Sequence, residues 1–219
     1  MRWSRNLAYA IGLITSDGNL SKDGRHISIC SKDLEQIENF KKVVNIKNKI
    51  SRKSGAYVNN EKYYLCQFSN VQLYRFLISI GLMPNKSKIL NEIMVPNKYF
   101  IDFLRGLFDG DGYSHSYFDK RWKNSFLLYV GFVSASEKFL LWLRNKIYDQ
   151  YGLKGSIVVA GRTAHQLRFA KTASVKLIHQ MYKGRDSVYL TRKKYKIDQS
   201  LGIIRIQNAG MSKLVYERA

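Results

Sequence analysis

Apolar and polar positions along this chain follow two periods, and the same order of periods occurs twice. Alternation at every second position predicts strands, whereas apolar residues three to four positions apart predict amphipathic helices. The first series has strand patterns at 26–30, 50–53 and 63–68 and helix patterns at 34–44 and 70–81. The second has strand patterns at 129–133, 156–160 and 165–169 and helix patterns at 137–147 and 172–184. The sequence therefore predicts an α+β unit that is duplicated within one chain.

Polar residues and glycines stand where these helices are expected to begin and end. Ser31 precedes the first helix pattern, and Ser134 with Glu137 fits a capping box in the second series. Gly81 and Gly184 follow the later helix of each series, in keeping with the preference for glycine just after a helix C-terminus. The second copy has a longer interval before its serine, which predicts a longer hairpin around 113–124.

Each series opens with an apolar stretch that ends in an Asp–Gly pair, at 10–18 and at 104–112. Small residues recur four positions apart in both stretches and so share one helix face; they are Ala8, Gly12 and Ser16 in the first and Gly106 and Gly110 in the second. Rows of small residues let two helix backbones approach closely, which is a reason to keep a glycine that costs about 1 kcal/mol against alanine in a helix. We therefore expect two helices that pack on each other.

Asp17 and Asp111 stand at the ends of these two expected helices. An anion there meets the negative end of the helix dipole, so folding alone does not favour the placement. The chain carries 37 Lys and Arg against 16 Asp and Glu, a net charge of +21, which is the electrostatic character of a polyphosphate binder. The pattern suggests two metal-binding carboxylates at the centre of a nucleic-acid surface.

Composition limits the class of protein. The 219 residues are 45% hydrophobic, which allows a folded core and excludes a disordered basic tail. Charge alone would also fit a ribosomal-type or merely soluble basic protein. Cys30 and Cys66 show no zinc-ligand spacing, so we expect thiols in a reducing intracellular compartment, either the cytoplasm or an organelle matrix. The apolar run at 7–14 imitates a signal peptide but is short and soon followed by Asp17, so a folded helix and no membrane partner are expected.

The two Asp–Gly stretches resemble the LAGLIDADG motifs of homing endonucleases, in the monomeric type that carries both copies in one chain. The second stretch, 104–112, is a near match, and the first departs from the motif at Thr15 and Ser16. The eighth position, which carries the catalytic acid in that family, is aspartate in both copies, Asp17 and Asp111. The resemblance extends over roughly 5–200.

The resemblance implies two pseudo-symmetric αββαββα repeats, packed through the motif helices and presenting a saddle of strands to DNA. The repeats would span 1–96 and 97–200 and leave an unassigned tail at 201–219.

The resemblance also implies hydrolysis of phosphodiesters with two or more Mg²⁺ ions at Asp17 and Asp111. Carboxylates and backbone carbonyls are the oxygen ligands that Mg²⁺ prefers, and the carbonyls of Ser16 and Gly110 are the implied additional ligands. Lys86 and Lys194 fall at matching places and are similar to the family's basic residue near the scissile phosphate, although each has equally basic neighbours that fit ordinary phosphate contacts.

Ser31 and Ser134 occupy the place where the family often has a polar, water-positioning residue. Both serines are equally suited to capping a helix, and we favour the capping role.

Base reading would fall to side chains on one face of the strands, where every second residue can point into the major groove. The candidates are Ser28, Arg52, Lys53, Gln67, Arg121, Lys123, Tyr129, Arg162, Gln166 and Arg168. A shift of one residue in strand parity would move a candidate to the other face.

With these residues, the resemblance implies a monomeric, Mg²⁺-dependent, site-specific double-strand DNA endonuclease of the kind encoded by mobile introns or inteins. Two alternatives remain on the same scaffold: a maturase that binds intron RNA, and a DNA-binding regulator without catalysis. Paired acids argue against a role in binding alone.

Overall fold

The computed structural model describes residues 1–219 except 55–61, 123–124, 162, 185–186 and 217–219. The first half contains helices α1 (Arg5–Asp17), α2 (Leu34–Val44) and α3 (Val71–Ser79), strands β1 (Gly18–Leu20), β2 (His26–Ser31), β3 (Ile50–Ser54) and β4 (Lys62–Ser69), and the 3₁₀ turn η1 (Lys86–Lys88). The second half contains η2 (Asn97–Tyr99), helices α4 (Phe100–Asp111), α5 (Glu137–Tyr151), α6 (Lys171–Met181) and α7 (Thr191–Tyr216), and strands β5 (Gly112–Phe118), β6 (Phe126–Ser134), β7 (Ser156–Ala160) and β8 (Ala164–Phe169).

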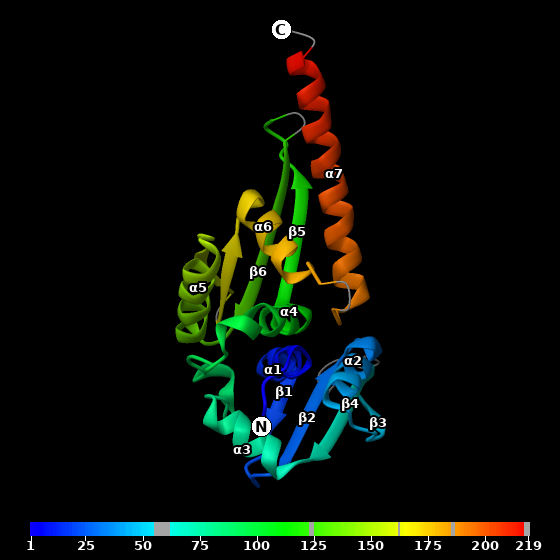
Figure 1. Ribbon diagram of the computed structural model, residues 1–219, viewed down its shortest axis with the longest axis vertical. Helices are drawn as coiled ribbons and strands as arrows, with labels where there is room; N and C mark the ends of the chain where they lie inside the picture. The colour runs from blue at the N-terminus through cyan, green and yellow to red at the C-terminus, as the bar shows by residue number, and fades with distance from the viewer. Residues whose placement is uncertain (55–61, 123–124, 162, 185–186, 217–219) are drawn as a thin grey trace.

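Each half has its own four-stranded antiparallel sheet, and the strand orders β1-β2-β4-β3 and β5-β6-β8-β7 correspond to each other. Figure 1 shows the two halves one above the other, with α1 and α4 side by side between them. This arrangement confirms the predicted α+β fold with two pseudo-symmetric halves joined through the motif helices. The hairpin of β5 and β6 is the longer one, as the interval before Ser134 predicts.

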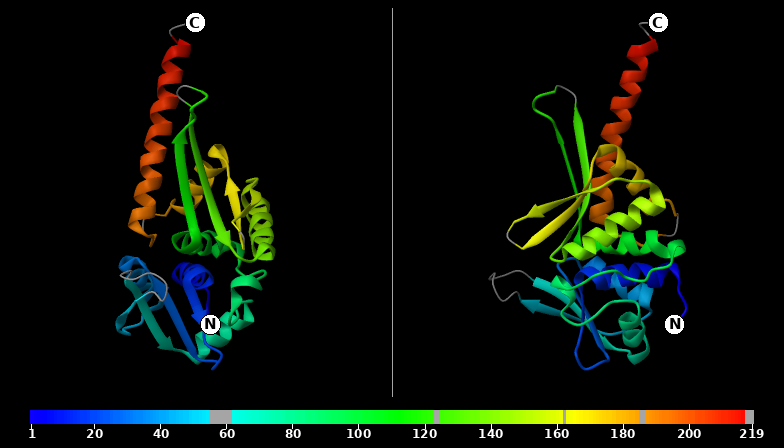
Figure 2. Two further views of the ribbon diagram at one scale, coloured as in Figure 1. Left: turned by 180° about the vertical axis from the view of Figure 1, so that it is seen from behind. Right: turned by 90° about the vertical axis from the view of Figure 1, so that its left-hand side faces the viewer.

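The two sheets bury the alternate residues that the sequence pattern predicts. Ile27 and Ile29 of β2 are fully buried, as are Leu128 and Val130 of β6. Because successive strand residues point to opposite faces, the residues between them lie on the face away from this core. In Figure 2 the helices of each half lie against one side of its sheet. The other side of each sheet is open.

The contact between α1 and α4 depends on glycine at two positions, Gly12 and Gly106. A methyl group on Gly12 would lie 2.2 Å from the carbonyl oxygen of Phe103, and one on Gly106 would lie 2.0 Å from the carbonyl oxygen of Tyr9. Either would overlap the opposing backbone, so no larger residue fits without separating the helices. The prediction that small residues pack the motif helices against each other is confirmed.

Helices α2 and α5 begin where the pattern predicts, but the two predicted capping residues are wrong. The N-caps are Asp33 for α2 and Ser136 for α5, and the Ser136 hydroxyl accepts from the Phe139 amide at 3.3 Å. Ser31 and Ser134 instead accept from the amides of Asp33 and Ser136, just before each helix. A capping signal read from sequence fixes a helix start only to within a few residues.

The glycines after the later helices also differ. Gly81 has a φ of 106°, which only glycine adopts easily, in agreement with its predicted place after α3. Helix α6 ends at Met181 with Tyr182 as C-cap. The helix therefore stops earlier than predicted, and Gly184 is not the residue directly after its C-cap.

Helix α7 breaks the duplication. Its 26 residues start at Thr191 and run across the predicted boundary at 200, so much of the unassigned tail continues a helix. The corresponding segment of the first half forms only the short turn η1. In Figure 1, α7 lies beside β5 and extends past the end of the sheet. Among the described helices none is both long enough and apolar enough to cross a membrane.

Candidate active site and nucleic-acid interface

The packing of α1 against α4 brings Asp17 and Asp111 to one place between the halves. Each aspartate is the last residue of its helix, and the helix ends touch. A methyl group on Gly110 would lie 1.9 Å from the hydroxyl of Ser16 and 2.8 Å from a carboxylate oxygen of Asp17. The side chain of Asp17 therefore borders the backbone that carries Asp111, as the paired-acid prediction requires.

The surroundings of both carboxyls disfavour ionisation, and the charge of Asp17 adds to this effect at Asp111. Loss of surrounding water and, second, the nearby charge of Asp17 together raise the pKa of Asp111 to about 6, although part of Asp111 remains open to solvent. Burial also raises the pKa of Asp17, against the opposing effect of a hydrogen bond from Gln36. Two like charges that share a poorly solvated place would be stabilised by a bound cation.

Asp17 has a partner that the sequence did not suggest. The side-chain amide of Gln36, which is 2% exposed, donates to a carboxylate oxygen of Asp17 at 2.5 Å. The hydroxyl of Ser31 donates to the side-chain oxygen of Gln36 at 3.2 Å. The sequence feature that indicates this contact is a polar residue, Gln36, beside Ile37 on the buried face of α2. Ser31 thus supports the first acid through Gln36 and does not cap the helix.

Lys86 lies beside the first acid, as predicted. Its side chain is 7% exposed and its ammonium donates to the carbonyl oxygen of Gly18, the residue that follows Asp17. Burial lowers the pKa of Lys86 to about 8, while Asp111 and Asp17 oppose the shift.

Lys193, and not Lys194, lies beside the second acid. The ammonium of Lys193 donates to the carbonyl oxygens of Phe108, Gly110 and Gly112, each at 2.7 Å. Burial lowers the pKa of Lys193 to about 8. Since an ammonium has three protons, these bonds use all of them, and they hold the end of α4 that carries Asp111. The matching contact with the glycine after each acid makes Lys193 the counterpart of Lys86.

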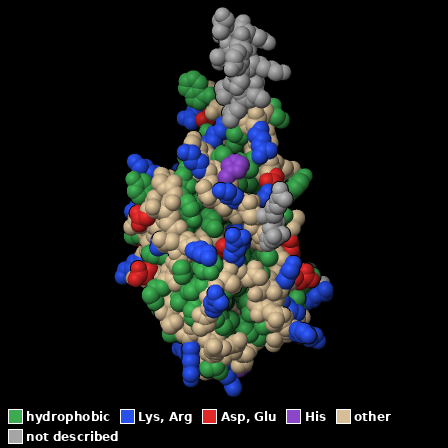
Figure 3. Space-filling model, viewed as in Figure 1, with side chains coloured by type: hydrophobic (Ala, Val, Ile, Leu, Met, Phe, Trp, Pro, Cys, Tyr) green, Lys and Arg blue, Asp and Glu red, His purple; other side chains and the backbone are tan. Residues whose placement is uncertain are grey.

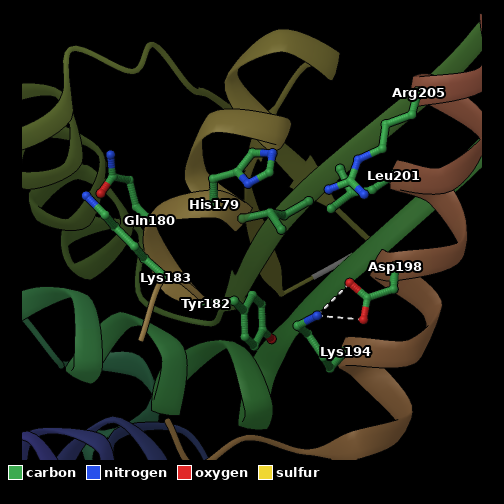
Figure 4. A pocket seen from close by; sticks show the side chains of 9 residues that line it. His179, Gln180, Tyr182, Lys183, Lys194, Asp198, Leu201 and Arg205 are labelled. Carbon is green, nitrogen blue, oxygen red and sulfur yellow. Dashed lines mark hydrogen bonds and ion pairs between the residues drawn. The ribbon is translucent and has the colours of Figure 1, made fainter. Parts of the chain in front are cut away.

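Lys194 faces a different part of the molecule, which corrects the predicted register by one residue. Its ammonium contacts both carboxylate oxygens of Asp198 at 2.5 Å and lies 5.2 Å from the ring centroid of Tyr182. Figure 4 shows Lys194 and Asp198 in the cleft between α6 and α7, with His179 and Arg205 on its walls. One residue of helix turns a side chain by about 100°, so adjacent lysines on α7 cannot point to the same place.

A third acid, Asp109, is buried behind Asp111 at the sixth position of the motif. One of its carboxylate oxygens accepts from the hydroxyl of Tyr9 at 2.7 Å and from the amide of Leu190 at 2.8 Å. Burial raises the pKa of Asp109 to about 6. The corresponding residue in the first motif is Thr15, whose hydroxyl donates to the carbonyl oxygen of Ile11 within α1 at 2.7 Å. Asp109 therefore fastens the start of α7 to α4.

The open face of the first sheet carries two of its predicted DNA contacts. Ser28 and Gln67 are directly opposite each other on β2 and β4 and point away from the core. Arg52 pairs with Tyr64 and shares the side of Ile50, which packs on the core, so its predicted orientation is wrong. The backbone of Lys53 pairs with Tyr63, but the side chain of Lys53 lies outside the described part.

The open face of the second sheet brings three predicted residues together. Arg168 lies with its guanidinium 4.9 Å from the ring centroid of Tyr129, and Gln166 accepts from the hydroxyl of Tyr113 at 3.1 Å. These side chains line an open groove of about 560 Å³ together with His115. Tyr113 and His115 were missed, although they alternate along β5 on the same face. An open groove with aromatic, amide and guanidinium groups can contact bases.

The other predicted contacts are at turns. Arg121, between β5 and β6, donates to Asp119 through Nε and Nη2 while its side chain remains 80% exposed. Lys123 and Arg162 lie outside the described residues. Figure 3 shows Lys and Arg side chains spread widely over the visible face, with fewer acids among them.

The residues at the two acids fit divalent cations of the Mg²⁺ type. All donors on offer are oxygens, namely the Asp17 and Asp111 carboxylates and the carbonyls at the helix ends. The Gly110 carbonyl accepts from Lys193 yet has a second lone pair. The described residues contain no group of three or more His, Cys, Asp or Glu, so water and phosphate would have to complete the coordination.

Comparison with known proteins gives the fold. No protein-family model and no curated protein sequence matches the chain. Among solved structures, the homing endonuclease I-WcaI bound to its DNA recognition sequence superposes with a TM-score of 0.64, at 16% identity over 90% of this chain and 87% of that one. Full-length DUF199/WhiA from T. maritima gives 0.59, at 14% identity over 99% and 69%.

A third structure, I-DmoI in complex with DNA and Mn, gives a TM-score of 0.54 at 17% identity over 83% and 98%. This chain therefore has the fold of the LAGLIDADG homing endonucleases, which the WhiA LAGLIDADG domain shares.

Proposed function

We propose that this protein is a site-specific double-strand DNA endonuclease that uses divalent cations at Asp17 and Asp111. The observation that carries the proposal is the convergence of the two acids at the touching ends of α1 and α4, each beside a buried lysine. This centre lies between two open sheets. Two of the solved structures with the same fold are complexes with DNA, so DNA is the nucleic acid we propose.

Each half would supply the groups for one strand cut. Bound divalent cations would neutralise charge on the phosphate and lower the pKa of an attacking water. Gln36 orients the Asp17 carboxylate through its amide. Lys86 uses one proton on the Gly18 carbonyl in the described contacts, which leaves donors for a phosphate or leaving oxygen. Lys193 fixes the end of α4 and adds positive charge.

A protein that only binds DNA would gain nothing from two carboxylates placed at its most phosphate-proximal point, since they would repel the backbone. Retention of both acids thus favours catalysis over the regulatory alternative. Mobile introns and inteins remain the proposed source of such a protein, and the target is proposed to be long and largely asymmetric because the two open faces differ in sequence.

The decisive experiment is selection of cleaved molecules from a randomised DNA pool, with Mg²⁺ in one arm and EDTA in the other. We expect recovery of one long site, cut in both strands, only with Mg²⁺. Selective binding of a site without cleavage in either arm would refute catalysis.

One chain should suffice for one duplex, because both acids belong to the same chain. Sedimentation of the free and DNA-bound protein should give one chain per target. A two-chain complex on a palindromic site would contradict the proposed pairing of the acids.

A further inference from the structure

The first turn of α2, in the first half, is fastened to the first turn of α7, in the second half. The guanidinium of Arg192 donates to both carboxylate oxygens of Asp33, at 2.7 and 2.6 Å. The amide of Thr191 donates to the carboxylate of Glu35 at 3.1 Å, and the Thr191 hydroxyl donates to the same carboxylate. We call these four residues, Asp33, Glu35, Thr191 and Arg192, the α2–α7 latch.

The latch is a built contact and more than a chance ion pair. Glu35 places a negative charge on an amide that has no partner within the helix, at the positive end of α7. The fork of Arg192 matches the carboxylate of Asp33 in the two-bond arrangement that fixes orientation as well as distance. A third bond, from the side-chain amide of Asn39 to the carbonyl of Tyr189 at 2.9 Å, continues the contact along α2.

Each side of the latch is followed in the chain by a residue that contacts one acid or the backbone next to it. Gln36 follows Glu35 and donates to Asp17. Lys193 follows Arg192 and donates to the carbonyls of Gly110 and Gly112, on either side of Asp111. The latch therefore closes a chain of contacts that runs from one acid to the other without passing through the α1–α4 packing.

Exposure indicates what the latch does. The Arg192 side chain is 60% exposed, and exposed ion pairs contribute little to the free energy of unfolding. The rate of a reaction depends far more strongly on where a nearby charged group lies, because a displacement of about 1 Å can slow a reaction about a hundredfold. The latch should matter more for the position of Lys193 than for the stability of the fold.

We propose that the α2–α7 latch is a positioning device by which the first half sets Lys193 and the end of α4 at the second acid, so that the two strand cuts are coupled. This inference rests on the proposed endonuclease function and adds positioning residues to that same site. Asp33 and Arg192 contact neither acid directly and act through Gln36 and Lys193.

The test is single-turnover cleavage of a supercoiled plasmid that carries the selected target, at saturating protein. We expect Arg192→Gln and Asp33→Asn to slow the conversion of nicked to linear DNA by about tenfold, in the range for outer contacts that orient reacting groups. Nicked plasmid should accumulate, since Asp17 keeps its hydrogen bond from Gln36 and can still serve one strand cut. The charge-exchanged double variant Asp33→Arg/Arg192→Asp should recover most of the rate.

A matched control is Asp198→Asn, which removes another exposed ion pair from the same helix, on the side of the α6–α7 cleft. It should cleave like the wild type. Thermal unfolding of all variants should shift by no more than a few degrees, as for the loss of about 1 kcal/mol or less.

Wild-type rates in both single latch variants would overturn the inference. So would a loss of rate that parallels a large loss of thermal stability and is not recovered by the exchanged variant, because the latch would then serve only the fold. If the wild type itself cuts no DNA with Mg²⁺, the proposed function fails and the inference falls with it. The wild-type lane therefore separates the two failures.

Discussion

The two halves place their acids alike but support them differently. Asp17 accepts a hydrogen bond from Gln36 and lies near Lys86, which contacts a single carbonyl. Asp111 has no comparable side-chain bond among the described contacts, and its support comes from Lys193, which holds three carbonyls of the same helix end. Duplication thus preserved the backbone position of the acids, which the tight helix contact enforces, while the surrounding polar groups diverged.

The divergence continues behind the acids. The second half has Asp109 and helix α7, whereas the first half has Thr15 and the short turn η1. Because Asp109 and the latch both fasten the start of α7, the second site depends on contacts from far along the chain. The first site depends on its neighbours in α2. We expect substitutions to reveal this asymmetry.

The largest effect is expected at the acids themselves. Asp17→Asn or Asp111→Asn should reduce double-strand cleavage by about a hundredfold or more while DNA binding is retained, since each removes a charged metal ligand and a repulsive anion near phosphate. Cleavage and gel-shift assays on one target measure both quantities. Normal double-strand cutting by either variant would show that the acids are not the catalytic pair.

The next largest effect is expected at the two buried lysines, and it should differ between the two halves. Lys86→Met and Lys193→Met should each slow cleavage at saturating protein by about tenfold to a hundredfold, as for the loss of one positioned charged donor. Lys193→Met should also lower the free energy of unfolding by about 1–3 kcal/mol, because it leaves buried carbonyls without their donor.

Lys194→Met is the matched control for the lysines, being adjacent and equally basic but paired with Asp198. Single-turnover rates and urea unfolding would be compared across the three variants. A slow Lys194 variant beside a normal Lys193 variant would contradict the register that the structure gives.

Glycine substitutions test the feature that the halves share. Gly12→Ala or Gly106→Ala should destabilise the protein by about 1–3 kcal/mol or more, because the added methyl meets backbone that cannot move alone. Gly202→Ala is the control on α7, where a methyl group meets no atom within 4 Å and should stabilise the helix by up to about 1 kcal/mol. Urea denaturation measures each value. Stability equal to wild type in both motif variants would mean that α1 and α4 are farther apart than these distances imply.

The smallest effect concerns pH. Since burial raises the pKa of Asp111 from 3.8 to about 6, the unfolded chain loses this proton at lower pH than the folded chain does. The free energy of unfolding should therefore fall as pH rises from about 4 to about 6, relative to the Asp111→Asn variant. At pH 7 without metal the variant should be more stable by up to about 1 kcal/mol, a figure reduced for solvent screening.

Added Mg²⁺ should raise the melting temperature of the wild type more than that of the Asp111→Asn variant, because the cation binds only where both acids remain. Thermal unfolding at two pH values with and without Mg²⁺ measures this. A variant less stable than the wild type at pH 7 without metal would exclude mutual repulsion of the acids.

Local patterns in the sequence determined the two acids and most of the elements, although not helix α7. Period-two and period-3.6 apolar spacing placed the strands and helices to within a few residues, because these patterns depend on which side of an element is buried. The small residues of the motif stretches predicted the α1–α4 contact, since only such residues permit it. The motif spacing then identified Asp17 and Asp111 without any structure.

Only the tertiary structure decided which polar residues meet the acids. Whether Lys193 or Lys194 faces Asp111 depends on the rotation of α7, which Asp109 and the latch set from distant parts of the chain. Gln36 contacts Asp17 because two helices and a strand converge there. Arg52 does not lie on the open face, because the register of β3 against β4 places it on the other side. Such contacts join residues far apart in sequence, and no local period encodes the rotation or register that brings them together.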